Sequence, residues 1–179
     1  MMNAKRAEPW EVREWLNTEH SISLESLCGK VILLEAFQML CPGCVAHALP
    51  QAMRVRNLFS PDDVAVIGLH TVFEHHEAQG PRAALEAFLH EYRISFPVGI
   101  DAPSANGRLP KTMAAYGMQG TPTTILIDPE GHIRKHKFGR EEDLVLGAEI
   151  MALLREKPAV MGSEGRDTSE RCTDEGCPV

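Results

Sequence analysis

The chain reads Val31-Ile-Leu-Leu-Glu-Ala-Phe37 and, after three intervening residues, Cys41-Pro-Gly-Cys44, where a helical pattern begins. An almost continuous apolar run predicts a strand that is buried on both faces, as in the centre of an α/β sheet. A strand that delivers Cys-x-x-Cys to the start of a helix is typical of a redox dithiol. Because the first N–H groups of a helix lack internal partners and favour an anion, we expect Cys41 to ionise more readily than a free thiol.

Cys44 follows Cys41 by about one helical turn, so the spacing predicts that one thiol attacks and the other resolves. Two other readings of the motif stay open at this point, half of a zinc site and a structural bridge. A zinc ribbon needs a second Cys-x-x-Cys or a His pair within about 15–20 residues. The nearest candidates for that second half, His70 and the pair His75-His76, lie further away.

The overall composition predicts one globular domain with a tail. The 179 residues, 44% of them hydrophobic, fit a single domain, and the net charge of −7 disfavours nucleic acid or an anionic membrane as a partner. No apolar run approaches the ~20 residues of a membrane span, and the polar N-terminus does not resemble a signal peptide. We therefore expect a cytoplasmic protein, in which a persistent structural disulfide is disfavoured.

The patterning predicts an α/β fold in which a central mixed β-sheet is flanked by helices and followed by a C-terminal β-hairpin and a closing helix. We expect a globular domain over residues 1–156, with a helical extension at 8–18 (its core at 9–17), and a flexible tail over 157–179. The expected strands are 31–37, 64–69, 96–100, 123–128 and 132–138. The other expected elements are a turn or hairpin at 21–30 and helices at 42–59, 81–92, 109–116 and 141–155.

Three stretches resemble the thioredoxin superfamily, within it the redoxin branch that includes TlpA-like proteins. They are Leu24-Glu-Ser-Leu27-Cys-Gly-Lys-Val31, the segment from Val31 to Cys44, and Gly120-Thr-Pro122-Thr. The resemblance runs from about Ile22 to Leu154. It implies a thioredoxin-like sheet and a thiol–disulfide oxidoreductase that needs no cofactor beyond the Cys41-Cys44 dithiol.

The resemblance also implies roles for individual residues. Thr121-Pro122 corresponds to a turn with a cis peptide bond that faces the disulfide, and a cis bond before proline costs only ~0.5–1 kcal/mol. The implied partners are disulfide-containing proteins or low-molecular-weight thiols, together with a recycling reductant. The residues expected to contact the substrate are Leu40, Pro42, Gly43, Thr121 and Pro122.

Glu35 lies six positions before Cys41, where many relatives carry a buried acidic or amide side chain beneath the dithiol. A carboxyl group in an apolar strand should have a raised pKa, which suits it to accept a proton from Cys44. The alternative is that Glu35 points outward or pairs with a lysine.

Other polar residues near the motif carry weaker expectations. His47, one turn beyond Cys44, is placed to tune its thiol or to bind a metal with it, although such a histidine is more often simply packed on a helix. His70 and the pair His75-His76 could line the rim of the site or be solvated. Cys28 is expected to be a redundant surface thiol.

The chain departs from the family pattern in two places. Gln38-Met-Leu40 stands where relatives usually place tryptophan just before the first cysteine, so the docking surface should differ. Pro50 lies nine rather than eight positions after Cys41, which predicts a one-residue shift or a local bulge in the helix.

Two other functions remain as alternatives. In a peroxidase of the peroxiredoxin kind, Cys41 would be oxidised to a sulfenic acid and then resolved. Relatives of that kind carry threonine three residues before the cysteine, where this chain has Gln38. A metal-binding or copper-delivery module would use Cys41, Cys44 and a histidine, because thiolates suit Cu(I).

Cys172-Thr-Asp-Glu-Gly-Cys177 places two further thiols in the tail, either as incidental residues or as an internal redox partner of Cys41-Cys44. Cys172 lies seventeen positions after Arg155. A flexible segment of that length has a root-mean-square reach of ~20–25 Å, more than the ~15 Å radius of gyration of such a domain. A relay through the tail is therefore within reach.

If the tail relays electrons, oxidised Cys44→Ser protein should contain a disulfide from Cys41 to Cys172 or Cys177, because tethering raises the effective thiol concentration to about millimolar. Disulfide mapping by mass spectrometry tests this. Unchanged turnover after deletion of the residues beyond Pro158 would instead make the tail a passive end.

Overall fold

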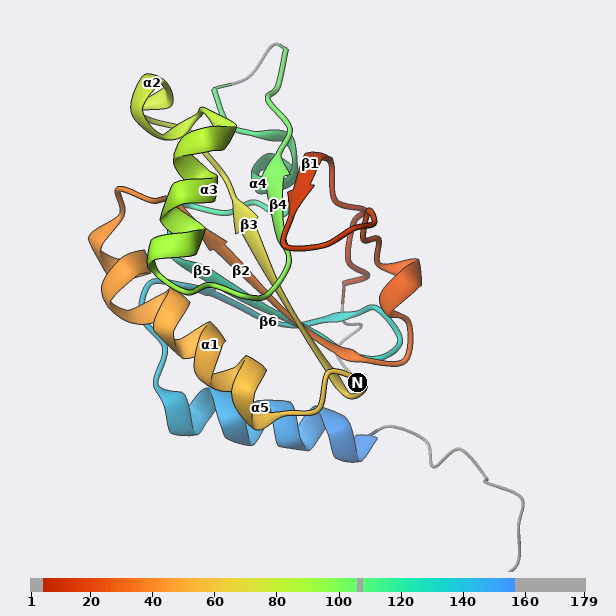
Figure 1. Cartoon of the computed structure of the whole chain (residues 1–179). Helices are drawn as coiled ribbons and strands as arrows, with labels where there is room; N and C mark the ends of the chain where they lie inside the picture. Colours follow the sequence, from red (N-terminus) through yellow and green to blue (C-terminus); the bar gives the residue numbers. More distant parts are fainter. Residues whose placement is uncertain (1–4, 106–107, 157–179) are drawn as a thin grey trace, which may run out of the picture.

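A computed structural model describes residues 5–105 and 108–156 (Figure 1). Their centre is a six-stranded mixed sheet in the order β1-β4-β3-β2-β5-β6. The predicted α/β class, with a closing hairpin and helix, is confirmed. The strands are β1 (Val12–Leu16), β2 (Val31–Phe37), β3 (Val64–His70), β4 (Val98–Asp101), β5 (Thr123–Ile127) and β6 (Ile133–Phe138).

Strand β2 holds the central position. It pairs in parallel with β3 along its whole length and antiparallel with β5 on its other edge. All seven of its residues are buried. The apolar run before the dithiol therefore forms the strand that the sequence predicts, because only a central strand loses water from both faces.

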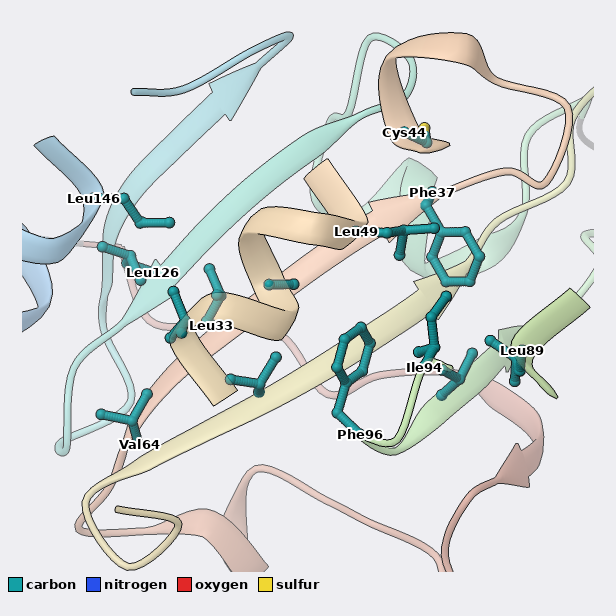
Figure 2. Close-up of a cluster of buried hydrophobic side chains, with 14 of the residues drawn as sticks. Leu33, Phe37, Cys44, Leu49, Val64, Leu89, Ile94, Phe96, Leu126 and Leu146 are labelled. Carbon is teal, nitrogen blue, oxygen red and sulfur yellow. The ribbon is translucent and has the colours of Figure 1, made fainter. Parts of the chain in front are cut away.

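Helices cover the two faces of the sheet unequally (Figure 1). Helices α1 (Leu49–Leu58), α3 (Arg82–Glu91) and α5 (Asp143–Glu156) pack on one face, and α4 (Lys111–Ala115) packs on the other. Alternate residues of β2 divide between these two cores. Val31, Leu33 and Phe37 join the larger one, which also contains Cys44 at one end, beyond Phe37 (Figure 2).

The helix that follows the dithiol begins at Pro42 and contains a widened turn. Cys44–Ala48 is π-helical and continues directly into α1, with Pro50 in the first turn of α1. A π-turn contains one more residue than an α-turn. This is the bulge that the late position of Pro50 predicts. Pro50 has no N–H to donate within the continuous helix, and the widened turn directly before it is where the helical hydrogen-bond pattern changes.

The helix predicted over residues 8–18 is wrong. Val12–Leu16 form strand β1, antiparallel to β4. A shift of register between Val12 and Glu14 interrupts the alternation of side chains, which hides the strand in the sequence. A β-carbon on Gly99 of β4 would lie only 2.8 Å from Val12, so glycine gives β1 the room to pair there. Pairing with a distant strand overrides the local pattern.

Two short helices complete the described fold. Residues 21–30 contain a short 3-10 helix, Glu25–Leu27, and the segment after β3 contains a helix that the sequence pattern did not predict, α2 (His76–Gln79).

No helix among the described residues is long and apolar enough to span a membrane. The tail expected over 157–179 lies outside the described residues.

Candidate active site

Cys41 and Cys44 form a disulfide at the start of the helix that follows β2. The N–H of Val45 donates to the carbonyl oxygen of Cys41 at 3.1 Å, which makes Cys41 the N-cap of the helix that begins at Pro42. Its Sγ accepts the N–H of Cys44 at 3.2 Å, where a serine or aspartate oxygen usually caps a helix. When the disulfide opens, this N–H and the helix dipole stabilise a thiolate on Cys41.

The two sulfur-bearing residues differ in exposure. Cys41 is partly exposed, whereas Cys44 is 0% exposed and packs in the core. Leu40, directly before Cys41, is 57% exposed, and Pro42 is exposed as well. An incoming disulfide therefore meets Cys41 before it meets Cys44.

The loop before β5 lies opposite Cys41. The bond between Thr121 and Pro122 is cis, as the resemblance implies, and the carbonyl oxygen of Thr121 lies 3.5 Å from Cys41 Sγ. A β-carbon on Gly43 would lie 3.3 Å from Cδ of Pro122. The dithiol loop and the proline loop are thus in close contact, and glycine at position 43 permits it.

Glu35 lies inside the sheet beneath this site, 1% exposed. It occupies the position of β2 between Leu33 and Phe37, which faces the same core as Cys44. Thr124 Oγ1 donates to its Oε2 at 2.8 Å, and its Oε1 has no partner. Burial raises the pKa of Glu35 from 4.5 to about 8. The alternatives of an outward-pointing or lysine-paired Glu35 are wrong.

Buried amides beside the dithiol are the part of the site that the sequence did not indicate. Gln79, at the end of α2, accepts the N–H of Leu40 and donates to the side chain of Gln38. Gln38 stands out in the sequence because it precedes the dithiol, but nothing local connects it with a residue about forty positions later. A buried glutamine on an otherwise exposed helix is a signal that appears only with the fold.

The candidate histidines do not gather around the sulfur atoms. His47 is exposed on the π-turn, and His75 and His76 are exposed on the segment that ends at Gln79. His70 is buried against the ring of Phe37, 5.3 Å between ring centroids, and burial lowers its pKa to about 4. His70 therefore does not line the rim.

The remaining candidates lie away from the dithiol. Cys28 is an exposed free thiol, as expected. Cys172 and Cys177 lie outside the described residues. Within 5–105 and 108–156, no three His, Cys, Asp or Glu side chains are grouped to hold a metal ion. At the position expected to carry a threonine hydroxyl in a peroxidase, Gln38 carries an amide, and its Oε1 accepts from Gln79 Nε2. Neither alternative function is favoured.

Comparison with known proteins supports the same assignment. Residues 5–136 match the AhpC/TSA family. The chain is 30% identical over 136 residues to the thiol-disulfide oxidoreductase ResA of Halalkalibacterium halodurans, covering 75% of this chain and 68% of that protein. It is 32% identical over 150 residues to Protein DipZ of Mycobacterium bovis, covering 82% of this chain but only 20% of DipZ.

Two solved structures superpose closely. A thioredoxin-like superfamily protein shares 56% identity with a TM-score of 0.82, covering 84% of this chain and 97% of the other. A thiol-disulfide isomerase from Corynebacterium glutamicum shares 45% identity with a TM-score of 0.81, covering 86% and 98%. With its Cys41-Cys44 disulfide on a thioredoxin-like fold, the chain belongs to the AhpC/TSA family of the thioredoxin superfamily and is a thiol–disulfide oxidoreductase.

Proposed function

We propose that the chain reduces disulfides of proteins or small molecules, with Cys41 as the nucleophile and Cys44 as the resolving thiol. The observation that carries this assignment is the difference in exposure: Cys41 is accessible at the helix start, whereas Cys44 is 0% exposed. Only an accessible thiolate can reach a disulfide in another molecule.

The reaction balances over two exchange steps. Cys41 thiolate attacks one sulfur of the substrate, forms a mixed disulfide and releases the other sulfur as a thiolate. Cys44 thiolate then attacks Cys41 Sγ, re-forms the intramolecular disulfide and releases the second substrate thiolate. Two electrons pass from the dithiol to the substrate, and a thiol reductant returns them in a separate exchange.

Glu35 is proposed to accept the proton of Cys44 before the second step. It faces the core that contains Cys44, and its Oε1 has no other partner. With a pKa of about 8, a fraction of Glu35 is ionised near neutral pH and is a competent base. Thr124 holds the other carboxyl oxygen and so fixes the orientation of the group.

The substrate is proposed to dock across Leu40, Pro42 and the Thr121-Pro122 loop, which surround Cys41. The exposed side chain of Leu40 takes the place of the usual tryptophan and supplies apolar contact. A cytoplasmic location, as expected from the sequence, remains a prediction, and it suits net reduction of substrates.

Cys41→Ser should abolish reduction of a chromogenic disulfide, because no thiolate remains at the accessible position. Cys44→Ser should instead trap a mixed disulfide on Cys41, detected by intact-mass spectrometry. Cys28→Ser is the matched control and should keep wild-type turnover. Faster alkylation of Cys44 than of Cys41 in the reduced protein near neutral pH would reverse the assignment.

Glu35→Gln should slow dithiol exchange on the order of 10²-fold near neutral pH, since an amide of the same shape cannot accept a proton. Stopped-flow measurement of the resolving step from about pH 6 to 9 tests this. A rate equal to that of the wild type throughout this range would remove Glu35 from the mechanism.

The same variant should change how the stability of the disulfide form depends on pH. The pKa of Glu35 is 4.5 before burial and about 8 in the fold, so between these values unfolding releases a proton and the free energy of unfolding falls as pH rises. Glu35→Gln lacks this titration. In urea unfolding, the free energy of unfolding of Glu35→Gln relative to that of the wild type should therefore rise by a few kcal/mol from about pH 5 to 8. A pH-independent difference would contradict the buried, protonated carboxyl group.

A further inference from the structure

Two buried amide side chains hold the three residues that join β2 to Cys41. Gln38 is 1% exposed and Gln79 is 0% exposed. Gln79 Nε2 donates to Gln38 Oε1 and to the carbonyl oxygen of Glu74, both at 2.8 Å. Gln79 Oε1 accepts the N–H of Leu40 at 3.2 Å. We name this set, the Gln38 and Gln79 side chains with the N–H of Leu40, the amide clamp.

The amide clamp acts on the backbone directly before the nucleophile. The N–H of Cys41 donates to the carbonyl oxygen of Gln38 at 3.3 Å, which closes a turn over residues 38–41. The N–H of Leu40 is not used inside this turn and donates instead to Gln79 Oε1. The clamp therefore ties the turn to α2 and fixes the backbone from which Cys41 Sγ projects toward the N–H of Cys44.

The two redox forms depend on this support to different degrees. In the disulfide form, the covalent bond to Cys44 already holds Cys41 in place, and Cys44 is packed in the core. Reduction removes that bond. The hydrogen bonds of the turn and of the amide clamp then remain to keep Cys41 Sγ beside the N–H of Cys44.

We infer that Gln79 is a positioning residue for Cys41, acting through the N–H of Leu40 to hold the sulfur at the helix start in the dithiol form. This inference rests on the proposed function, because it concerns the same dithiol. Without the amide, the N–H of Leu40 loses its partner and the turn loosens. The thiolate then loses stabilisation that the disulfide form does not need.

Gln79→Met keeps the length of the side chain and removes its hydrogen bonds. The ionisation constant of Cys41 should fall about three- to tenfold, measured from the pH dependence of alkylation by iodoacetamide. The reduced form should be disfavoured by a similar factor in equilibrium with glutathione, and a tenfold change corresponds to a potential about 30 mV more negative.

Gln51→Met is the matched control. Gln51 is 6% exposed, and its Nε2 donates to the carbonyl oxygen of Glu141 at 3.0 Å and to Asp143 Oδ1 at 2.7 Å, so it ties α1 to the start of α5 rather than to the turn. Both variants should lower the melting temperature. Only Gln79→Met should shift the potential and the alkylation profile.

Gln38→Met provides a second test should Gln79→Met fold poorly. It leaves the bond between Gln79 and Leu40 intact, so its shift should be smaller and in the same direction, and the double variant should shift no further than Gln79→Met alone. A lower melting temperature without any change in potential or alkylation profile would make Gln79 a structural residue only and overturn the inference. Both readouts need no substrate, whereas failure of the proposed function would appear as absent turnover in the wild type.

Discussion

The fixed register of β2 is the constraint on which the rest of the site depends. This strand is hydrogen-bonded along both edges and buried on both faces, so it cannot slide without breaking two ladders. A slip by one residue would turn Glu35 toward the α4 face and away from the core that holds Cys44. Because β2 has a fixed position, the carboxyl group that it carries and the turn and dithiol that follow it also have fixed positions.

Cys41, the proposed nucleophile, is supported from two directions at the end of the sheet. The helix supplies an N–H to Cys41 Sγ from within the motif, and α2 supplies an amide to the preceding residue from outside it. Glu35 is buried on the face of β2 that packs against the core containing Cys44. In the proposed mechanism, the charge on Cys41 depends on the hydrogen bonds of the turn and of the helix start. Proton transfer from Cys44 depends instead on the burial of Glu35. The two steps of exchange would therefore respond to different parts of the molecule.

Much of this arrangement was predictable because its signals are local. The strand before Cys41, the helix after it and the proline loop each have a recognisable composition and spacing. The late position of Pro50 predicts a one-residue shift or a bulge, which the structure shows to be a π-turn. Strand β1 was missed because its partner is distant and a shift of register interrupts its alternation. Gln79 was missed because a glutamine acquires this role only when the fold brings α2 beside Leu40. Contacts between remote segments leave little trace in a single sequence.

The contact between Gly43 and Pro122 limits how the dithiol loop can vary. A β-carbon on Gly43 would lie 3.3 Å from Cδ of Pro122, so a side chain there would press on the loop that faces Cys41. A change at position 43 is thus coupled to the loop that contains Pro122. Introducing a side chain there would require that loop to shift or to be redesigned with it, as a single structural unit.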